Sequence, residues 1–293
     1  MKKRAILWFL VPVSVVYLGL YMYPALNSIF VSFFDWSGFG KKMAFIGFSN
    51  YKELFRDPLF IQSLKNTGIY MVFGGILLFI LVFSFTYVLL SGVRFKKFFR
   101  AIIFLPNIIA LIALASIWTY IYNPNFGLLN GFLRAIGLDI LTRPWMAPDR
   151  MIWAVIVAIV WIQAGFFTII LLSGAEKIPP SYYEAAALDG ANRFKRFFSI
   201  TIPLIWEELR IAVSLWLILS IKMFEFIYAF GSVTTPPTNM WTGTLYMYIL
   251  AFGKRVTIYR LGYASSVAVA LLILIIIAIV VTSRIFKREA VEY

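Results

Sequence analysis

The sequence contains no cysteine and no histidine. Without cysteine there is no disulfide framework and no thiolate metal site. Without histidine the chain lacks the commonest general base and the commonest metal ligand in proteins. These two absences exclude hydrolase triads and zinc chemistry, and we predict no catalytic residue and no metal site in this chain.

Charge is also scarce. Only 14% of the 293 residues are charged, whereas 62% are hydrophobic and 18% aromatic. A soluble domain of this length is about a quarter charged and about half apolar. More apolar surface is present than one soluble core can cover, which excludes an ordinary soluble enzyme. The abundance of aromatic residues excludes disorder.

The apolar residues are concentrated in long runs without charge. Five such runs cover residues 5–34, 67–93, 101–133, 151–175 and 261–283. In a sixth segment, 211–230, the only charged residues are Lys222 and Glu225. About 20 helical residues cross a bilayer, and the runs lack the alternation of barrel strands. We therefore predict an all-α membrane protein with about six transmembrane helices in a single domain, residues 1–293.

The basic residues predict the orientation of these spans. The first run follows Met1-Lys2-Lys3-Arg4, as in a signal peptide, but it is too long and no cleavage site follows. An uncleaved first span with six crossings puts both termini in the cytosol. The inside segments then hold 15 Lys and Arg in 60 residues, against 11 in about 90 residues outside. This asymmetry agrees with the positive-inside rule and predicts a multi-pass protein of a bacterial-type plasma membrane.

The excess of 27 basic over 13 acidic residues also raises the question of nucleic acid. The apolar composition favours loop ends that face anionic lipid headgroups, so we expect membrane lipid as a partner and no nucleic acid.

Outside the membrane we predict a surface helix within residues 50–67, interrupted near Pro58, and an irregular loop over 123–150.

The longest inside segment, residues 176–208, predicts a helical hairpin. Pro179-Pro180 precedes a helix over 181–189, Gly190 supplies a turn, a second helix covers 191–199, and Pro203 ends it. The second helix has an aromatic face, formed by Phe194, Phe197 and Phe198, and a basic face, formed by Arg193 and Arg196. Periodicity alone allows either a docking element for a partner or a hairpin that lies on lipid.

The residues of this hairpin carry a motif. Glu184-Ala185-Ala186, Gly190, Ile200 and Ile202-Pro203 match E-A-A-x3-G-x9-I-x-L-P, with Ile202 in place of Leu. This pattern resembles the EAA loop of permease subunits of binding-protein-dependent ABC importers. The surrounding stretch, which includes Asp189, resembles the carbohydrate-uptake branch, and most of the chain is similar to a maltose-type or glycerol-phosphate-type first permease. The family often has Gly-Gly-Pro after the fifth span, where this chain has Thr234-Thr235-Pro236-Pro237.

The resemblance implies the function and the partners. The chain would translocate a carbohydrate with a second permease, expected to be a different chain, two ABC ATPase subunits and an extracytoplasmic solute-binding protein. No G-x-x-x-x-G-K-[ST] phosphate loop is present, so we expect no cofactor in this chain and ATP and Mg on the ATPase subunits. The chain itself is then not an enzyme.

The resemblance also assigns a coupling role to the hairpin, which would sit in a cleft of the ATPase. We list its candidate residues as Glu184, Ala185, Ala186, Asp189, Gly190, Ile200 and Pro203. Glu184 offers an acceptor for an Arg of the ATPase. The alternative is that Glu184 only complements the dipole of its own helix.

Polar residues within the spans are candidates for the substrate path. Lys222 and Glu225 lie three residues apart, and on a continuous helix they share one face and can pair with each other. Ionisable groups at this depth face a cavity or another span, so a sugar-facing patch and a structural ion pair both fit. Tyr228 belongs to the same segment of the resemblance. Asn107 and Gln163 have sugar-binding side chains, but lone amides in spans also join helices.

Two other classes of function remain open at this stage. A self-sufficient secondary carrier coupled to an ion gradient would show an inverted repeat and proton-relay carboxylates, and neither is evident. A purely structural membrane scaffold would transport nothing. Dependence of uptake on an ATPase separates all three.

Overall fold

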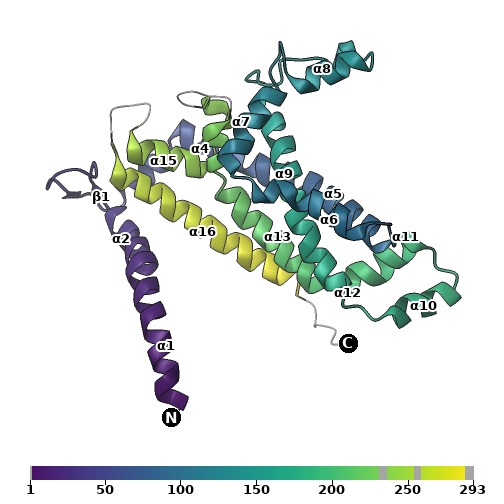
Figure 1. Cartoon of the computed structure of the whole chain (residues 1–293). Helices are drawn as coiled ribbons and strands as arrows, with labels where there is room; N and C mark the ends of the chain where they lie inside the picture. Colours follow the sequence, from purple (N-terminus) through teal and green to yellow (C-terminus); the bar gives the residue numbers. More distant parts are fainter. Residues whose placement is uncertain (1, 231–235, 254–258, 288–293) are drawn as a thin grey trace. The chain divides into compact units, whose positions relative to one another are not determined.

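The computed structural model describes residues 2–230, 236–253 and 259–287, with side chains from Trp8 onward (Figure 1). Helices make up nearly all of the regular structure in these ranges. The internal contacts divide the chain into two units, Met1–Ile61 with Gly243–Leu274, and Gln62–Thr242 with Ile275–Tyr293. A single permease domain over the whole chain stays a prediction.

The predicted membrane spans are confirmed in number and character. In the described part of the chain, five helices are long and apolar enough to cross a bilayer: Trp8–Val31, Pro58–Leu90, Met151–Ala175, Trp206–Ala229 and Leu261–Ile285. A sixth span is formed if Lys96–Ile108 and Leu111–Ile121 are counted as one crossing, with a bend of 99° between them. The chain is a multi-pass helical membrane protein.

The first unit begins with a continuous helix made of α1 (Lys2–Tyr17), a π-helical turn η1 (Leu18–Met22) and α2 (Tyr23–Val31). Every described side chain from Trp8 to Asn27 is exposed. A hairpin of two-residue strands follows, β1 (Phe34–Asp35) and β2 (Ala44–Phe45), which pair antiparallel. Asn50 fixes this turn, since its Nδ2 donates to the carbonyl oxygens of Ser32 at 2.8 Å and Phe34 at 3.0 Å.

The segment predicted as an interrupted surface helix is instead two separate elements. The short helix α3 (Ser49–Leu54) ends before Pro58, as expected. However, α4 (Pro58–Ile69) continues through the π-helical turn η2 (Tyr70–Gly74) into α5 (Gly75–Leu90), so the second span starts nine residues earlier than the charge-free run. Proline is tolerated at the first turn of a helix, where its missing N–H has no helical partner anyway. Pro58 therefore starts the second span.

The third span is broken, which the charge-free run did not predict. Helix α6 (Lys96–Phe104) and the 3-10 turn η3 (Leu105–Ile108) are separated from α7 (Leu111–Ile121) by two extended residues, Ile109 and Ala110. Asn107, in η3, donates its Nδ2 to the carbonyl oxygen of Ile162 at 2.6 Å. Irregular backbone at membrane depth is tolerated where protein groups satisfy it, and this amide ties the break to the fourth span.

The fourth span, α9 (Met151–Ala175), is the centre of the second unit. Sixteen of its 25 residues are buried, and it packs against α5, α6, η3 and α13 (Trp206–Ile221). Gly165 allows a close crossing, because an added Cβ would lie 2.1 Å from the carbonyl oxygen of Ile103. Small residues at such crossings are the usual way for membrane helices to approach closely.

The segment after the third span contains α8 (Leu128–Ala135) and η4 (Asp139–Leu141), where we predicted an irregular loop. Asn130 holds this segment together, since its Oδ1 accepts from the indole Nε1 of Trp145 at 2.8 Å and its Nδ2 donates to the carbonyl oxygen of Arg143 at 3.0 Å. The prediction of irregular structure over 123–150 is thus only partly right.

The remaining elements complete the chain. They are α10 (Pro180–Leu188), α11 (Arg193–Arg196), η5 (Phe197–Thr201), α12 (Ile202–Leu204), α14 (Glu225–Ala229), η6 (Thr238–Met240), α15 (Gly243–Phe252) and α16 (Leu261–Ile285). The apolar helix α15 lies between the fifth and sixth predicted spans, 211–230 and 261–283. Residues 234 and 235, which depart from the family pattern, lie outside the described residues.

Candidate functional site

The segment 176–208 forms the predicted helix–glycine–helix hairpin. Helix α10 ends at Leu188, Asp189 is its C-cap residue, and Gly190 follows with a φ of +77°. This left-handed conformation favours glycine because it lacks a Cβ. Asn192 then caps the next helix, since its Oδ1 accepts from the backbone N–H of Lys195 at 2.8 Å. The turn is therefore specified by two residues with different physical roles.

The second arm of the hairpin is longer than predicted. It runs from Arg193 through the π-helical turn η5 and α12 to Leu204, and the break comes at Ile205. Pro203 does not end the helix. It lies in the first turn of α12, where a proline is compatible with helical backbone.

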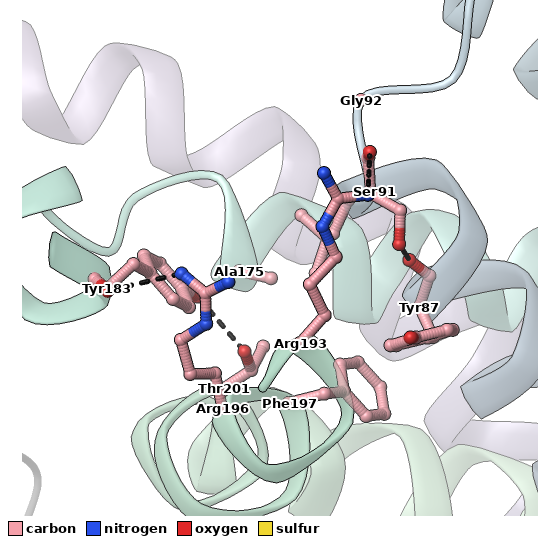
Figure 2. A pocket seen from close by; sticks show the side chains of 10 residues that line it. Tyr87, Ser91, Gly92, Ala175, Tyr183, Arg193, Arg196, Phe197 and Thr201 are labelled. Carbon is pink, nitrogen blue, oxygen red and sulfur yellow. Dashed lines mark hydrogen bonds between the residues drawn. The ribbon is translucent and has the colours of Figure 1, made fainter. Parts of the chain in front are cut away.

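The hairpin packs against the end of the second span (Figure 2). Phe197 is buried, with its ring centroid 5.4 Å from that of Tyr87 on α5 in an edge-to-face arrangement. Arg193 donates to the carbonyl oxygen of Ser91 at 3.3 Å, and the hydroxyls of Tyr183 and Thr201 are 3.0 Å apart. Arg196 joins the two arms, because its Nη1 donates to the carbonyl oxygen of Tyr183 at 3.2 Å.

The tip of the hairpin is exposed. Glu184, Ala185, Asp189 and Gly190 are all exposed, and Ala186 is half-buried. Ile200 and Pro203, on the second arm, are half-buried as well. The motif residues thus divide into an exposed group at the turn and a packed group at the base. This arrangement leaves the turn available to a partner.

A cluster of charges holds the base of the fourth span beside the hairpin. Glu176, directly after α9, accepts from Lys96 at 2.9 Å and lies 3.5 Å from Arg100. The hydrogen bond from Lys96 and the field of both cations hold the pKa of Glu176 below its usual range. The carboxylate stays ionised at neutral pH and links the start of α6 to the end of α9.

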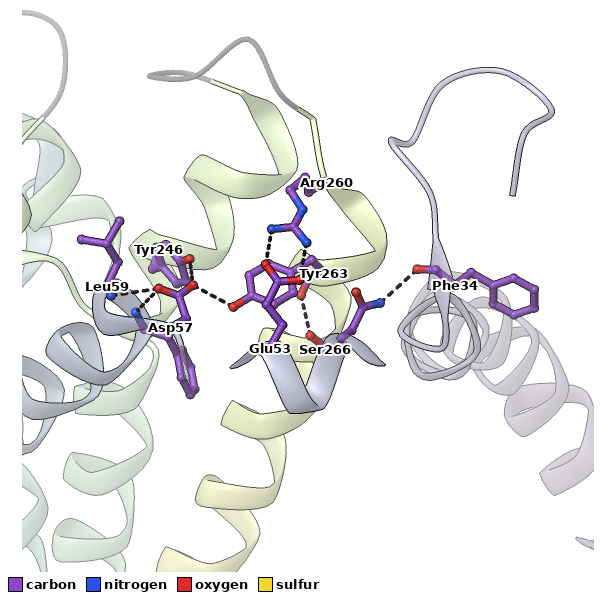
Figure 3. Close-up of polar contacts among 10 residues, drawn as sticks. Phe34, Glu53, Asp57, Leu59, Tyr246, Arg260, Tyr263 and Ser266 are labelled. Carbon is purple, nitrogen blue, oxygen red and sulfur yellow. Dashed lines mark hydrogen bonds and ion pairs between the residues drawn. The ribbon is translucent and has the colours of Figure 1, made fainter. Parts of the chain in front are cut away.

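A second polar cluster lies in the first unit (Figure 3). Burial opposes ionisation of Asp57, but hydrogen bonds from Tyr246 and from Tyr263, at 2.7 Å, and from two backbone N–H groups outweigh it and lower its pKa. Arg260 forms a bidentate pair with Glu53, with both distances 2.6 Å. Both acids precede the second span, and the cluster joins that segment to the beginning of α16.

The fifth span is interrupted between the two charged residues that we expected on one helix face. Helix α13 ends at Ile221 and α14 starts at Glu225, so Lys222 and Glu225 lie on either side of a break, and no ion pair joins them in the described part of the chain. The prediction of one continuous face is wrong. The carbonyl oxygen of Met223 within the break accepts from Thr242 Oγ1 at 2.6 Å, which satisfies a backbone group that the helix leaves free.

The path candidates lie on the third, fourth and fifth spans. Lys222 and Glu225 are exposed, and Tyr228 is half-buried and stacks on Phe224, with ring centroids 5.4 Å apart. Gln163 is half-buried on α9, one residue after the carbonyl that accepts from Asn107. That hydrogen bond gives Asn107 the structural role of joining two spans, which we predicted as the alternative to a role in the substrate path. Contact of these residues with substrate stays a prediction.

Comparison with known proteins decides the family. The sequence pattern of the family described as "Binding-protein-dependent transport system inner membrane component" matches residues 84–288. The chain belongs to this family. The predicted resemblance, based on the hairpin motif, is thereby confirmed.

Individual relatives agree with this assignment. The chain is 36% identical to the "Probable ABC transporter permease protein YurN" of Bacillus subtilis, over 97% of this chain and 96% of that protein. It is 30% identical to the "Diacetylchitobiose uptake system permease protein NgcF" of Streptomyces coelicolor, over 85% of this chain and 72% of that protein.

The fold is shared with a solved transporter. One chain of a bacterial alginate ABC transporter, in complex with alginate pentasaccharide-bound periplasmic protein, superposes with a TM-score of 0.76 at 24% identity, over 98% of this chain and 96% of that chain. This likeness supports the ABC importer permease fold.

Substitution of Gly190 tests the turn. A Cβ at this position meets no atom within 4 Å, so only the backbone conformation opposes a side chain. We expect Gly190→Val to cost about 1–2 kcal/mol, because a β-branched residue resists positive φ, and Gly190→Asn to cost less. Opening of the hairpin is measured as the rate of tryptic cleavage in detergent at the exposed Arg193 and Lys195. We expect cleavage of the Val variant about 5–30-fold faster. Equal rates for the Val and Asn variants would contradict this account of the turn.

Proposed function

We propose that this chain is the permease subunit of an ATP-driven ABC importer for a carbohydrate. The observation that carries the proposal is the exposed turn of the EAA hairpin in a chain that belongs to the binding-protein-dependent family. An exposed helical turn with a packed base is suited to docking into a partner, because the base transmits a force to the spans without bending. Family membership gives no support to a self-sufficient ion-coupled carrier.

The substrate class rests on the relatives. The Streptomyces relative is named for diacetylchitobiose uptake and the solved transporter for alginate, both of them carbohydrates. The solved transporter is in complex with a periplasmic binding protein, which supports an extracytoplasmic binding protein as a partner here. Two ATPase subunits and a second, different permease complete the proposed complex, with ATP and Mg held on the ATPase side.

The proposed mechanism runs through the hairpin. ATP binding closes the two ATPase subunits, and the hairpin turn moves with the cleft that holds it. The contacts of Phe197 with Tyr87 and of Arg193 with Ser91 then pass the displacement to the second span. A movement of rigid helices about a packed contact is a recognised form of conformational switching.

Uptake measurements test this function. Proteoliposomes contain the chain with its partner permease, ATPase and binding protein, and a panel of radiolabelled di- and trisaccharides is offered with and without ATP. We expect ATP-dependent uptake of a member of the panel, and at least about tenfold slower uptake with Glu184→Arg, since reversal replaces a charge-assisted contact by repulsion. The control is Asp139→Arg, the same reversal at an exposed residue remote from the hairpin sequence. Uptake driven by an ion gradient without ATP would overturn the proposal.

Cysteine labelling tests the proposed orientation, in which both termini and residues 176–208 are cytosolic. The chain has no cysteine of its own, so single introduced thiols give an unambiguous signal. Asp189→Cys should react with a membrane-impermeant maleimide only after cells are permeabilised, whereas Asp139→Cys should react in intact cells. Both positions are exposed. Labelling of position 189 in intact cells would invert the topology.

We also propose that Glu225 lines the path of the sugar, with Lys222, Tyr228, Gln163 and Asn107 near it. The break at residues 222–224 is compatible with this, because non-helical backbone at membrane depth occurs where it is buried in protein or lines a water-filled cavity. Glu225 begins the short helix α14, and an exposed carboxylate at membrane depth is costly in lipid.

Replacement of Glu225 distinguishes a path residue from a structural one. We expect Glu225→Gln to leave the complex assembled but to change the KM or the rate of sugar uptake several-fold, because an acceptor for sugar hydroxyls is weakened. Glu207→Gln is the control, since this exposed acid lies at the start of the same span. If Glu225→Gln prevents assembly and the double variant Lys222→Met, Glu225→Gln restores assembly and transport, the pair is structural.

A further inference from the structure

A cavity of about 360 Å³ with two arginines in its lining lies between the end of the second span and the hairpin (Figure 2). Its polar lining comes from Ser91 after α5, Tyr183 on α10, Arg193 and Arg196 on α11, and Thr201 in η5. None of the residues that line it is acidic. The cavity therefore carries two positive charges with no carboxylate among its walls.

The two guanidinium groups are incompletely paired. Arg193 is exposed and makes its bond to the Ser91 carbonyl at a long 3.3 Å. Arg196 donates one N–H to the Tyr183 carbonyl, but its Nε is shielded from solvent and has no partner in the described part of the chain. A buried donor on a charged group that lacks an acceptor costs free energy. An anion with several acceptor oxygens would remove that cost, and Arg is the side chain best suited to phosphate.

An apolar groove of about 320 Å³ adjoins this cavity. The two share Tyr87 and Phe197, and the groove continues along α5 past Val88, Phe83 and Ile80. The residues of α5 that line the groove lie on one face of the helix, because they recur at intervals of three and four: Ile80, Phe83, Ser84, Tyr87 and Val88. A cavity lined by two arginines therefore adjoins an apolar groove.

The position of both cavities relative to the bilayer fits a lipid. The apolar helix ends at Leu90, and Arg94, Lys96 and Lys97 follow, as is typical at a membrane surface. On this basis we place Ser91 near headgroup depth, and the groove then extends toward the middle of the membrane. Ile80 is about 16 Å along the helix from Ser91, close to half the thickness of the hydrocarbon core. This is the length that one acyl chain spans in one leaflet.

We propose that this composite site binds an anionic phospholipid, with its phosphate on Arg193 and Arg196 and one acyl chain in the groove along α5. Such a lipid would bridge the second span and both arms of the hairpin. The assignment of this site to the cytosolic leaflet rests on the proposed function and topology, whereas the lipid site itself does not. The same phosphate chemistry is offered by a soluble phosphate ester, which the test must separate from a lipid.

Lipid binding is measured on the purified full chain in detergent by native mass spectrometry. The probes are dioleoylphosphatidylglycerol and dioleoylphosphatidylcholine. We expect the anionic lipid to be retained over the zwitterionic one, and Arg196→Gln and Arg193→Gln each to weaken retention about tenfold, because each removes a charge-assisted contact. Lys195→Gln is the matched control, since this exposed cation on α11 does not line the cavity. Because Arg193 is exposed, its variant keeps the test valid if Arg196→Gln fails to fold.

A second arm separates the lipid from a soluble phosphate. Ser84 lines the groove only, and Ser84→Trp fills it while both arginines stay in place. We expect this variant to lose retention of phosphatidylglycerol, and glycerol 1-phosphate at millimolar concentration not to displace the lipid from the original chain. Displacement by glycerol 1-phosphate, or unchanged retention in Ser84→Trp, would overturn the lipid assignment. Equal retention in Arg196→Gln, Arg193→Gln and Lys195→Gln would also overturn it. None of these measurements depends on transport, so they stand apart from the test of the proposed function.

Discussion

The backbone of a membrane protein has no water to bond with inside the bilayer, and this constraint governs the structure of the chain. Each unsatisfied N–H or C=O in hydrocarbon costs several kcal/mol, so the spans are helices. At the break in the fifth span, Thr242 bonds a backbone carbonyl that the helix leaves free, and at the break in the third span Asn107 bonds to the fourth span through the carbonyl oxygen of Ile162. The π-helical turn in the second span is served by Trp216, whose indole Nε1 donates to the carbonyl oxygen of Met71 at 2.9 Å. The irregular points of the fold are thus held by specific polar side chains.

The residues for which we propose functional roles lie at or beside these irregular points. The break in the fifth span begins at Lys222 and ends before Glu225, and the break in the third lies beside Gln163. The hairpin that follows the fourth span is irregular in a third way, with a left-handed glycine between two capped helices. Regular helix provides the apolar spans and the packed contacts, whereas the exceptions place polar groups within the spans and an exposed turn at the hairpin. The two requirements are met by different residues of the same spans.

Sequence reasoning predicted the parts that depend on composition and local chemistry. The spans could be predicted from the long charge-free runs, because the free energy of transfer of a helix into lipid depends on its own composition and not on its tertiary contacts. The hairpin turn could be predicted from Gly190, because glycine favours the left-handed conformation whatever its tertiary surroundings. The bend in the third span was not predicted, although Pro106 at the start of its 3-10 turn was a local signal for it.

The break at residues 222–224 had no such signal, since the break contains neither glycine nor proline and depends on Thr242, 19 positions away. The same holds for the cavity beside the hairpin. Arg193 and Arg196 were recognised as one face of a helix, but their meeting with Ser91 requires the tertiary fold. Separation along the chain, rather than residue type, limited what the sequence could reveal.

The first span differs from the others in that its described side chains from Trp8 to Asn27 are all exposed. Interior positions of α9 are confined in shape, since a methyl group removed there leaves a void and one added there meets backbone. No such restriction applies within this chain to the first span, where exchange among Leu, Val and Phe changes only the free energy of transfer into lipid. Mutational drift in this helix should therefore preserve hydrophobicity while it leaves side-chain volume free, the opposite of the pattern expected for α9.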